Sequence, residues 1–325
     1  MSSASTEKKG HHQWSYLEGE FVEAKDAVLP ITTQAFNYGT SVFEGIRGYK
    51  SHSDGQVNIF RLDEHINRLH QSASILMIND LPDQQALKEI IQSLLHRNHT
   101  SGDCYIRPIA YKRNLLPGSG FGVKLSGVSS GLSVNSLDMQ TYVKQDGLTC
   151  TISGWRRVAD NAIPARAKIT GSYVNSALAM EAAMNGGYND AIMLNHSGYV
   201  AEATTSNVFI VKNKKLITPP VTANILEGIT RDTVITLAKQ YLDLTVEERD
   251  ILPSELLTAD ECFLTGTGVE ISPVSKIDFH HLRSTDTDSI AIKIKTVYQK
   301  IVRGELSDYN HWLTSIYSIN NQVEK

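Results

Sequence analysis

The stretch that decides the fold reads ARAKITGSY at residues 165–173, VAEATTSNVFIV at 200–211 and ILEGITRD at 225–232. A lone lysine in a sequence of this kind is usually a solvated surface residue. Here Tyr173 follows Lys168 closely, Glu202 ends a later strand, and Gly228 opens a helix. A lysine, a phenol and a carboxylate followed by a helix that opens on glycine favour a functional role for Lys168.

Length and composition indicate a soluble globular protein with two domains. The chain has 325 residues, of which 41% are hydrophobic and 20% charged, and its formal net charge is −4. No basic stripe suggests a nucleic-acid surface, and no apolar run approaches the ~18 residues of a membrane span. The N-terminal segment lacks the apolar core of a signal peptide. We therefore expect a protein that binds neither nucleic acid nor membrane.

Cysteine usage indicates a reducing compartment. The three cysteines are odd in number and widely spaced, which argues against a disulfide framework and against a zinc site; they are Cys104, Cys150 and Cys262. We therefore expect a cytoplasmic protein without a bound metal.

Apolar residues at three- and four-residue spacing predict the helices. In the N-terminal half this pattern runs over residues 63–77 and 83–97. In the C-terminal half a helix follows Tyr173, another covers residues 230–242, and an amphipathic helix covers residues 289–303.

Alternating patterns predict the strands of the N-terminal half. Residues 14–22 alternate around a Glu-Gly pair, which is typical of a β-hairpin. Residues 104–112 read as a strand in which Tyr105 and Arg107 share one face. Pro108 is expected to bend the chain just after this arginine.

Residues 117–131 contain many glycines and serines and predict a mobile loop. The segment is not a phosphate-binding P-loop, because it has no GxxxxGK[ST] motif and its glycine spacing is irregular. The loop is expected to become ordered over the active site when ligand binds. We place the connection between the domains at residues 136–147.

Taken together, these motifs resemble those of the class IV aminotransferases, which use pyridoxal phosphate (PLP). YGTSVFEGIR at residues 38–47 would by itself indicate only a packed β-hairpin, but it is similar almost letter for letter to the branched-chain-amino-acid aminotransferases. The resemblance covers residues 14–305. It implies a homodimer or higher homo-oligomer, in which a loop of the partner subunit helps to build each active site.

The resemblance also implies the fold and its division. The chain should be an α+β, two-domain PLP enzyme of fold type IV. Residues 1–135 would form a smaller N-terminal α/β domain, and residues 136–147 the connection. Residues 148–325 would form a larger PLP-binding domain with a pseudo-barrel of strands.

Three residues of the opening stretch match the family's PLP-binding residues. Lys168 would hold PLP as a Schiff base and then carry the proton. Glu202 would keep the pyridine nitrogen protonated, so that the ring withdraws electrons. Tyr173 would lie at the ring oxygen.

The phosphate of PLP requires backbone N–H groups at a helix N-terminus and suits the planar fork of an arginine. Arg68, in EHINRL, matches the arginine that grips the phosphate in the family. The other positions that the resemblance assigns to the cofactor are Leu226, Gly228, Ile229, Thr230, Gly266 and Thr267.

The resemblance places further residues around the substrate. Tyr38, Phe43 and Gly45 match the walls of an apolar side-chain pocket. Tyr105 and Arg107 match the residues that line the substrate site, where the arginine meets the distal carboxylate of glutamate.

Two segments differ from the common family pattern. The Thr-Gly-Thr-Gly turn, which would offer backbone amides to the substrate carboxylate, has Gly268 and Val269 where relatives often have alanines. Tyr142 matches the tyrosine of a Pro-Trp-Gly-Ala-Tyr segment, but the tryptophan is missing here.

The leading hypothesis is transfer of the amino group between branched-chain L-amino acids (leucine, isoleucine, valine) and 2-oxoglutarate in a ping-pong cycle. Other class IV activities are the alternative: D-amino-acid or amine transamination, or aminodeoxychorismate lyase. A third hypothesis is a catalytically silent binding or structural relative. Retention of Lys168, Tyr173, Glu202 and Arg68 argues against it. The preferred amino acid is left open, because pocket shape sets it.

Overall fold

The computed structural model describes residues 10–113, 122–139 and 146–317, and it divides into two compact units. The first unit holds residues 1–140 with 302–325, and the second holds residues 141–301. Each unit combines helices with one β-sheet, which confirms the predicted α+β class.

The C-terminal boundary differs from the predicted domain at residues 148–325. Strand β17 (Leu313–Ser315) pairs antiparallel with β5 (Val57–Phe60), so the end of the chain belongs to the first unit. This pairing joins segments from opposite ends of the chain, and no local sequence pattern indicates it. The boundary between the units at residues 140 and 141 falls inside the predicted connection.

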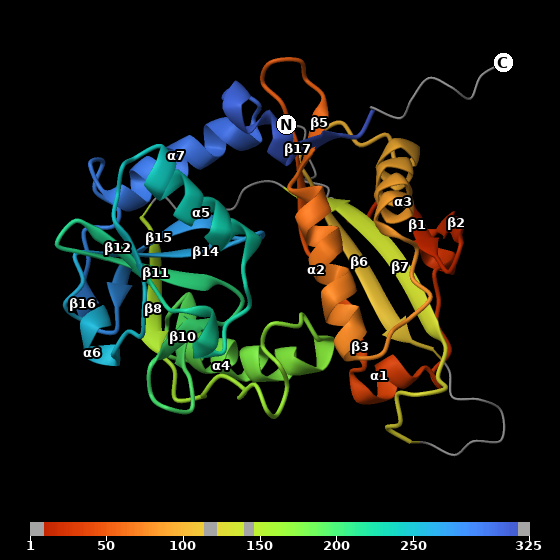
Figure 1. The fold of residues 1–325 in the computed structure, drawn as a ribbon, viewed down its shortest axis with the longest axis horizontal. Coiled ribbons are helices and arrows are strands. Elements are labelled where there is room, and N and C mark those ends of the chain that lie inside the picture. Colours follow the sequence, from red (N-terminus) through yellow and green to blue (C-terminus); the bar gives the residue numbers. More distant parts are fainter. Residues whose placement is uncertain (1–9, 114–121, 140–145, 318–325) are drawn as a thin grey trace, which may run out of the picture. The chain divides into compact units, whose positions relative to one another are not determined.

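The first unit is built on an antiparallel sheet. Over the described ranges the strand order is β17-β5-β4-β6-β7-β1-β2, with β3 paired to β6. Helices α2 and α3 pack against each other and against strands of this sheet (Figure 1). In chain order the elements are β1 (Trp14–Leu17), β2 (Glu20–Glu23), η1 (Ala24–Asp26), α1 (Gln34–Tyr38), β3 (Ser41–Phe43), β4 (Ile46–Lys50), β5, α2 (Leu62–Ile75), α3 (Gln84–Arg97), β6 (Cys104–Lys112), β7 (Ser130–Asp138), η4 (Ser307–Trp312) and β17.

Strand β7 (Ser130–Asp138) corrects the end of the predicted loop at 117–131 and the start of the predicted connection at 136–147, while residues 122–129 form no helix or strand, as predicted. It has nine residues and pairs with β6 over its whole length, from Cys104 opposite Asp138 to Lys112 opposite Ser130. Its many serines and its glycine obscured a strand whose register depends on the partner β6. Residues 117–121 of the predicted loop lie outside the described residues.

The second unit contains a mixed sheet that curls into a half-barrel, as the predicted pseudo-barrel requires. Within the described residues its order is β10-β9-β8-β15-β14-β11-β12-β13, with β16 paired to β15. In chain order the elements are β8 (Leu148–Ile152), η2 (Thr170–Ser172), α4 (Tyr173–Asn185), β9 (Asp190–Leu194), β10 (Val200–Ala203), β11 (Asn207–Lys212), β12 (Lys215–Thr218), η3 (Val221–Ala223), α5 (Ile229–Gln240), β13 (Val246–Glu248), α6 (Pro253–Leu256), β14 (Glu261–Gly266), β15 (Glu270–Ile277), β16 (His280–His281) and α7 (Ile290–Val302).

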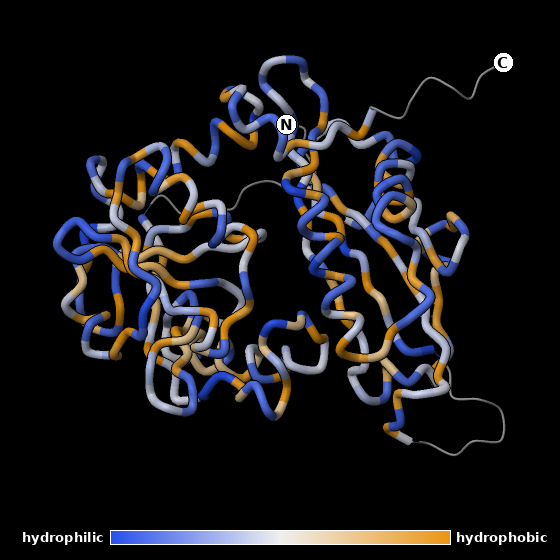
Figure 2. Tube along the Cα trace, in the orientation of Figure 1, coloured by the Kyte–Doolittle hydropathy of each residue, from blue (hydrophilic) through white to orange (hydrophobic). Residues whose placement is uncertain are grey.

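Apolar strands form the core of the second unit. The rings of Phe209 on β11 and Phe263 on β14 stack with centroids 5.1 Å apart, and both are fully buried. Figure 2 shows hydrophobic residues along the strands and hydrophilic ones in many of the turns. No helix within the described ranges is long and apolar enough to cross a membrane.

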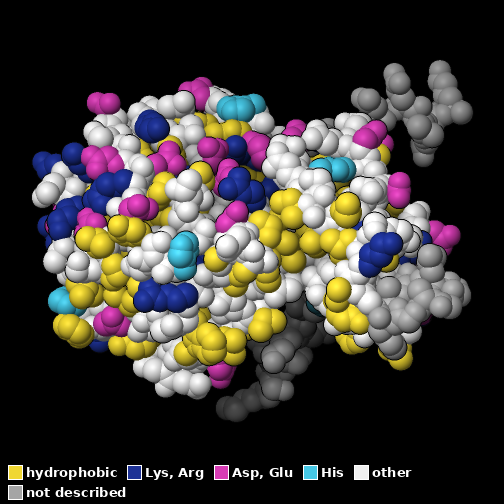
Figure 3. All heavy atoms as spheres, turned by 60° about the horizontal axis from the view of Figure 1, so that its bottom comes forward, with side chains coloured by type: hydrophobic (Ala, Val, Ile, Leu, Met, Phe, Trp, Pro, Cys, Tyr) yellow, Lys and Arg dark blue, Asp and Glu magenta, His cyan; other side chains and the backbone are white. Residues whose placement is uncertain are grey.

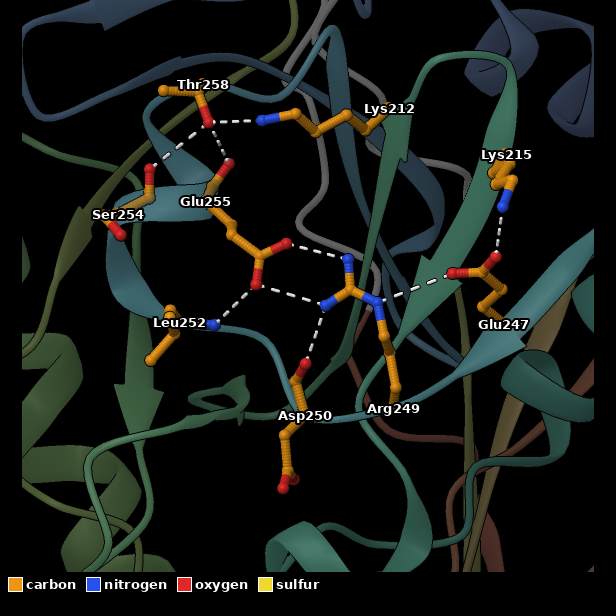
Figure 4. Close-up of polar contacts among 9 residues, drawn as sticks. All are labelled: Lys212, Lys215, Glu247, Arg249, Asp250, Leu252, Ser254, Glu255 and Thr258. Carbon is orange, nitrogen blue, oxygen red and sulfur yellow. Dashed lines mark hydrogen bonds and ion pairs between the residues drawn. The ribbon is translucent and has the colours of Figure 1, made fainter.

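A group of ion pairs orders the connection between β13 and α6 (Figure 4). Arg249 Nη2 donates to Glu255 Oε2 at 2.8 Å, and its Nε lies 3.5 Å from Glu247 Oε2. Glu255 also accepts from the backbone N–H of Leu252 at 3.0 Å, just before α6 begins. Partly exposed pairs of this kind contribute ~0.2–1 kcal/mol each, so this group orders a local segment and does not determine the fold.

Candidate active site

Lys168 lies in an irregular segment that leads into helix α4. Ser172 closes this segment, since its hydroxyl donates to the carbonyl of Ile169 at 2.7 Å. Helix α4 then begins at Tyr173, which places the phenol beside the lysine. Lys168 Nζ donates to the Tyr173 hydroxyl at 2.9 Å and lies 5.6 Å from the ring centroid. Two of the predicted residues are therefore in direct contact.

Glu202 is a buried carboxylate on β10, with 5% of the residue exposed. Its Oε1 accepts from Arg157 Nε at 2.7 Å. Its Oε2 accepts from Asn207 Nδ2 and from the backbone N–H of Leu226, both at 3.2 Å. Burial raises the pKa of the Glu202 carboxyl, and the Arg157 guanidinium acts in the opposite direction.

Lys168, Tyr173, Glu202 and Leu226 line one cavity of the second unit. These are four of the predicted cofactor residues. The cavity has further lining residues that were not predicted, namely Arg157, Ala165, Ala167, Ser172, Ser176, Thr204 and Thr205. A primary amine, a phenol and a buried carboxylate thus surround a single small space.

Arg157 and Asn207 are functional candidates that the sequence analysis missed. The Arg157–Glu202 ion pair joins residues 45 positions apart, so no spacing rule could have found it. Asn207 belongs to the quoted segment that carries Glu202, but its side-chain direction depends on the fold. Its Nδ2 donates to the Leu226 carbonyl at 2.9 Å as well as to Glu202.

The N-terminus of α5 is tightly packed. The helix begins at Ile229, and Thr230 in its first turn is 4% exposed. Gly228 precedes the helix, and a Cβ on this residue would lie 1.9 Å from Asn207 Oδ1. Glycine is therefore required here because the backbone approaches Asn207 closely. An accessible helix N-terminus favours an anion such as a phosphate.

Two buried hydroxyls near this helix strengthen the fit to a phosphate. Ser206 precedes Asn207, and Thr265 pairs with Asn207 across β11 and β14. Ser206 Oγ and Thr265 Oγ1 have no hydrogen-bond partner among the described residues. Buried hydroxyls normally find a partner, so these two suit a bound polar group. The residues of the second unit therefore fit PLP at both its ring and its phosphate end.

Gly228→Ala should lower both stability and cofactor affinity. The added methyl group displaces Asn207 and with it the hydrogen bonds to Glu202 and Leu226. Forced overpacking of this kind costs about 1–3 kcal/mol. Thermal unfolding and PLP titration measure the two effects. Gly154→Ala, also in the second unit, is the matched control, because a Cβ at Gly154 meets no atom within 4 Å; equal behaviour of the two variants would contradict the packing argument.

The Thr-Gly-Thr-Gly turn joins β14 to β15. Gly266 ends β14, and a Cβ on it would lie 3.4 Å from the buried Ser206 Oγ. Thr267 is half-buried and Gly268 is exposed, while Val269 packs against the apolar core of the sheet. The turn therefore lies next to one of the unpartnered hydroxyls, but its predicted contacts to phosphate and substrate stay predictions.

The first unit brings together Phe43, Gly45, Tyr105 and Arg107. The Arg107 guanidinium carbon lies 4.4 Å from the Phe43 ring centroid and 5.1 Å from that of Tyr105. Its Nη2 also donates to the Tyr105 hydroxyl. A Cβ on Gly45 would lie 2.2 Å from that hydroxyl, so the glycine makes room for the tyrosine. Four predicted substrate residues thus form one cluster.

The predicted bend at Pro108 is wrong. Strand β6 continues through this residue with an unbroken register against β7. On its other side β6 pairs with β4 up to Ile106 and with β3 from Ile109. The proline lies at the gap between these two neighbours, where its carbonyl accepts from the Glu44 backbone N–H at 3.0 Å. The strand thus tolerates an imino acid because no ladder hydrogen bond is lost.

The remaining predicted residues lie elsewhere. Arg68 is on α2, where its guanidinium pairs with Glu44, a residue of the quoted YGTSVFEGIR segment whose role was not predicted. Tyr38 ends α1 and is 39% exposed. Tyr142 lies outside the described residues.

Comparison with known proteins identifies the family. Residues 41–277 match the model of the family described as amino-transferase class IV. This match covers most of the chain, and the fold and the lysine-centred cavity agree with it. The chain therefore belongs to the class IV aminotransferases.

Within this class the chain is similar to branched-chain-amino-acid aminotransferases, as predicted. It is 41% identical over 305 residues to the probable enzyme of Aquifex aeolicus, covering 94% of this chain and 97% of that one. It is 35% identical over 316 residues to the Escherichia coli K12 enzyme, covering 96% and 99%.

Solved structures give the same result. The branched-chain aminotransferase of Thermoproteus uzoniensis with norvaline superposes with a TM-score of 0.88 at 35% identity, covering 95% of this chain and 100% of that one. The branched-chain amino acid aminotransferase of Thermobaculum terrenum in its PLP-bound holo form also gives 0.88 at 35% identity, covering 94% and 99%.

Proposed function

We propose that this chain is a PLP-dependent aminotransferase that moves the amino group between branched-chain L-amino acids and 2-oxoglutarate. The observation that carries the proposal is the contact between Lys168 Nζ and the Tyr173 hydroxyl at 2.9 Å, beside the buried, ion-paired Glu202. The names of the similar proteins support the branched-chain substrate over the other class IV activities.

Each residue around the cavity of the second unit would have its own role in catalysis. PLP, when bound, supplies an electron sink for the bonds broken at the substrate. The amine of Lys168 holds the cofactor and moves the proton at the substrate α-carbon. The Glu202 carboxylate would hold a proton at the ring nitrogen, and Arg157 orients that carboxylate and favours its ionised form. Tyr173 orients the lysine through its hydroxyl.

The phosphate would be held at the start of α5, which follows the cavity residue Leu226 in the chain. The backbone at Gly228, Ile229 and Thr230 offers N–H donors at the start of α5. The hydroxyls of Ser206, just before β11, and of Thr265, on β14, would add two more donors. The role of Arg68 at the phosphate stays a prediction that rests on its match to the family motif.

The aromatic cluster of the first unit would face the substrate side chain. Phe43 and Tyr105 supply apolar surface, and Gly45 leaves space for the tyrosine. Burial of aliphatic side chains favours larger substrates by ~0.8 kcal/mol per methylene, which gives a preference but no sharp exclusion. Arg107 Nε is buried and has no hydrogen-bond partner among the described residues. This supports a role for Arg107 in binding the distal carboxylate of glutamate.

Arg107→Met should slow the glutamate half-reaction far more than the leucine half-reaction. Loss of a charge-assisted hydrogen bond to the distal carboxylate of glutamate should slow the glutamate half-reaction about ten- to a hundredfold. The leucine half-reaction should change much less, because an aliphatic side chain makes no such bond. Stopped-flow measurement of both half-reactions tests this. Equal losses would mean that Arg107 supports only the Phe43–Tyr105 cluster.

An amino-acid panel tests the proposed function as a whole. The protein is loaded with PLP, and the change in cofactor absorbance is followed with L-leucine, L-isoleucine, L-valine, D-alanine and a primary amine. Fast conversion by the three branched-chain L-amino acids is expected. Faster conversion by D-alanine or by the amine would contradict the proposal, and no absorbance of bound PLP at all would contradict the enzyme class assigned to this site.

We also propose that the chain works as a cytoplasmic homodimer. The first unit exposes several large hydrophobic residues, namely Val28 at 70%, Ile31 at 81%, Phe36 at 77% and Val123 at 70%. Gln34 Nε2 donates to the carbonyls of Gly122 and Lys124, which places Val123 near α1. Figure 3 shows hydrophobic side chains in patches on the face drawn.

Exposed apolar patches of this kind mark interfaces, and twofold homodimers are the commonest assemblies. All three cysteines are free thiols, which supports a reducing compartment. Analytical ultracentrifugation of the purified protein tests the assembly, and a stable monomer at micromolar concentration would contradict it.

A further inference from the structure

Glu44 is a fully buried carboxylate that the proposed mechanism does not yet use. It follows β3, and its residue is 0% exposed. Its Oε1 accepts from Arg68 Nε at 2.7 Å, and its Oε2 accepts from Arg68 Nη2 at 2.8 Å. His65 Nδ1 also donates to Oε2 at 2.8 Å. Both partners lie on α2, three residues apart and therefore on one face of the helix.

The two hydrogen bonds to Glu44 fix the plane of the Arg68 guanidinium and the direction in which it points. Nε and Nη2 form the side edge of the planar fork, so the pairing with Glu44 is bidentate. The terminal edge of the fork then points away from the carboxylate by the geometry of the group. Arg68 is 9% exposed, so the surrounding packing also limits its movement.

The carboxylate remains charged despite its burial. Burial acts to raise the pKa of Glu44, but the Arg68 guanidinium and His65 hold that pKa well below its usual range. A buried ion pair of this kind is weak evidence for stability, because desolvation offsets much of the attraction. Such a pair is more readily explained if it orients one member for another task.

We propose that Glu44 is a positioning residue that fixes the orientation of the Arg68 guanidinium for its predicted role at the phosphate of PLP, with His65 holding the carboxylate in place. The inference rests on the proposed function, in which Arg68 binds that phosphate. It adds that the glutamate of the YGTSVFEGIR segment acts on the cofactor through Arg68, while its neighbours Phe43 and Gly45 belong to the substrate cluster.

Charge and orientation act in opposite directions here. The negative charge of Glu44 repels a phosphate, so its removal would strengthen binding if charge alone mattered. Its removal also takes away the two hydrogen bonds that orient a buried guanidinium, which weakens binding if orientation matters more. The bidentate geometry and the burial of the pair favour orientation, and the two effects predict changes of opposite sign.

The test compares PLP with pyridoxal, which has the same ring and no phosphate. Both are titrated into the apoenzyme by absorbance for wild type, Glu44→Gln and Arg68→Met. We expect Glu44→Gln to weaken PLP about ten- to a hundredfold and to leave pyridoxal within about twofold. The ratio of the two affinities would then fall in both variants, and the double variant should lose no more than Arg68→Met alone.

Glu64→Gln is the matched control. Glu64 is also on α2, and its carboxylate accepts from Arg61 Nε at 2.7 Å, outside the Glu44–Arg68 pair. Its neutralisation should leave the affinity ratio unchanged. If Glu44→Gln does not fold, Glu44→Asp keeps the charge and shortens the side chain by one methylene. That variant should still lower the ratio, because the bidentate contact cannot be made.

Three results would overturn the proposed role of Glu44. Equal loss for PLP and pyridoxal would assign Glu44 a purely structural role, and tighter PLP binding would show that its charge dominates; either result overturns the inference. An unchanged ratio in Arg68→Met overturns it by removing the phosphate role of that arginine. Failure of the PLP binding on which the inference rests is distinct, because wild type would then bind neither PLP nor pyridoxal.

Discussion

Lys168→Ala is expected to fold normally and to lose turnover on the order of a thousandfold or more. The residue is only half-buried, so truncation leaves no large cavity in the core. It would remove the amine that we propose as the holder of the cofactor and the carrier of the substrate proton. Steady-state turnover with L-leucine and 2-oxoglutarate, together with the thermal midpoint, measures both parts of the expectation.

Two further variants test whether the amine of Lys168, and not only its positive charge, is required for turnover. Lys168→Arg keeps a cation next to Tyr173, but a guanidinium is protonated at all working pH values and cannot act as the amine. It should be nearly as inactive as the alanine variant. Lys239→Ala removes an exposed lysine from α5 and should retain full turnover. Borohydride reduction of wild type should attach the cofactor to Lys168. Label on another lysine, or near-normal turnover of Lys168→Ala, would refute the assignment.

Glu202→Gln should slow proton abstraction about 10²- to 10³-fold while the protein still binds PLP. The substitution would remove the negative charge that we propose holds a proton at the ring nitrogen. Single-turnover half-reactions with L-leucine measure the chemical step directly. Rates equal to those of wild type would show that Glu202 has no such role.

The same variant should also be less stable, for a reason specific to this site. All three partners of the carboxylate are donors: Arg157 Nε, Asn207 Nδ2 and the Leu226 N–H. Either orientation of the new amide therefore sets its NH₂ group against a donor. Breaking a buried ion pair costs about 3–5 kcal/mol. Glu181→Gln, at an exposed position on α4, is the control and should leave both the rate and the thermal midpoint unchanged.

The order and type of the local motifs were sufficient to predict the class of the protein. Lys168, Tyr173 and Glu202 lie within one quoted stretch, and the segments between them fold by periodicities that a sequence displays directly. Helices α2 and α3 follow the same rule. Asp83, predicted to start the second helix, is its N-cap and accepts from the Ala86 N–H at 2.8 Å.

Sheet order was harder to predict, because strand pairing depends on partners that are remote in sequence. Strand β7 contains many serines and takes its register from β6, and β17 returns from the end of the chain to pair with β5. Local composition carries no information about such partners. Pro108 shows the converse, since a residue that usually disturbs a strand is accommodated at a gap between two neighbouring strands.

Within the site, the sequence by itself determined which chemical groups are present: an amine, a phenol, a carboxylate, and a glycine at the start of a helix. Only the tertiary structure decided what acts on them. It placed Arg157 on Glu202 and Glu44 on Arg68. It also placed Asn207 so close to residue 228 that only glycine fits there. The physical reason is that ion pairs and close packing act over a few ångströms in space, across separations along the chain that no periodicity encodes.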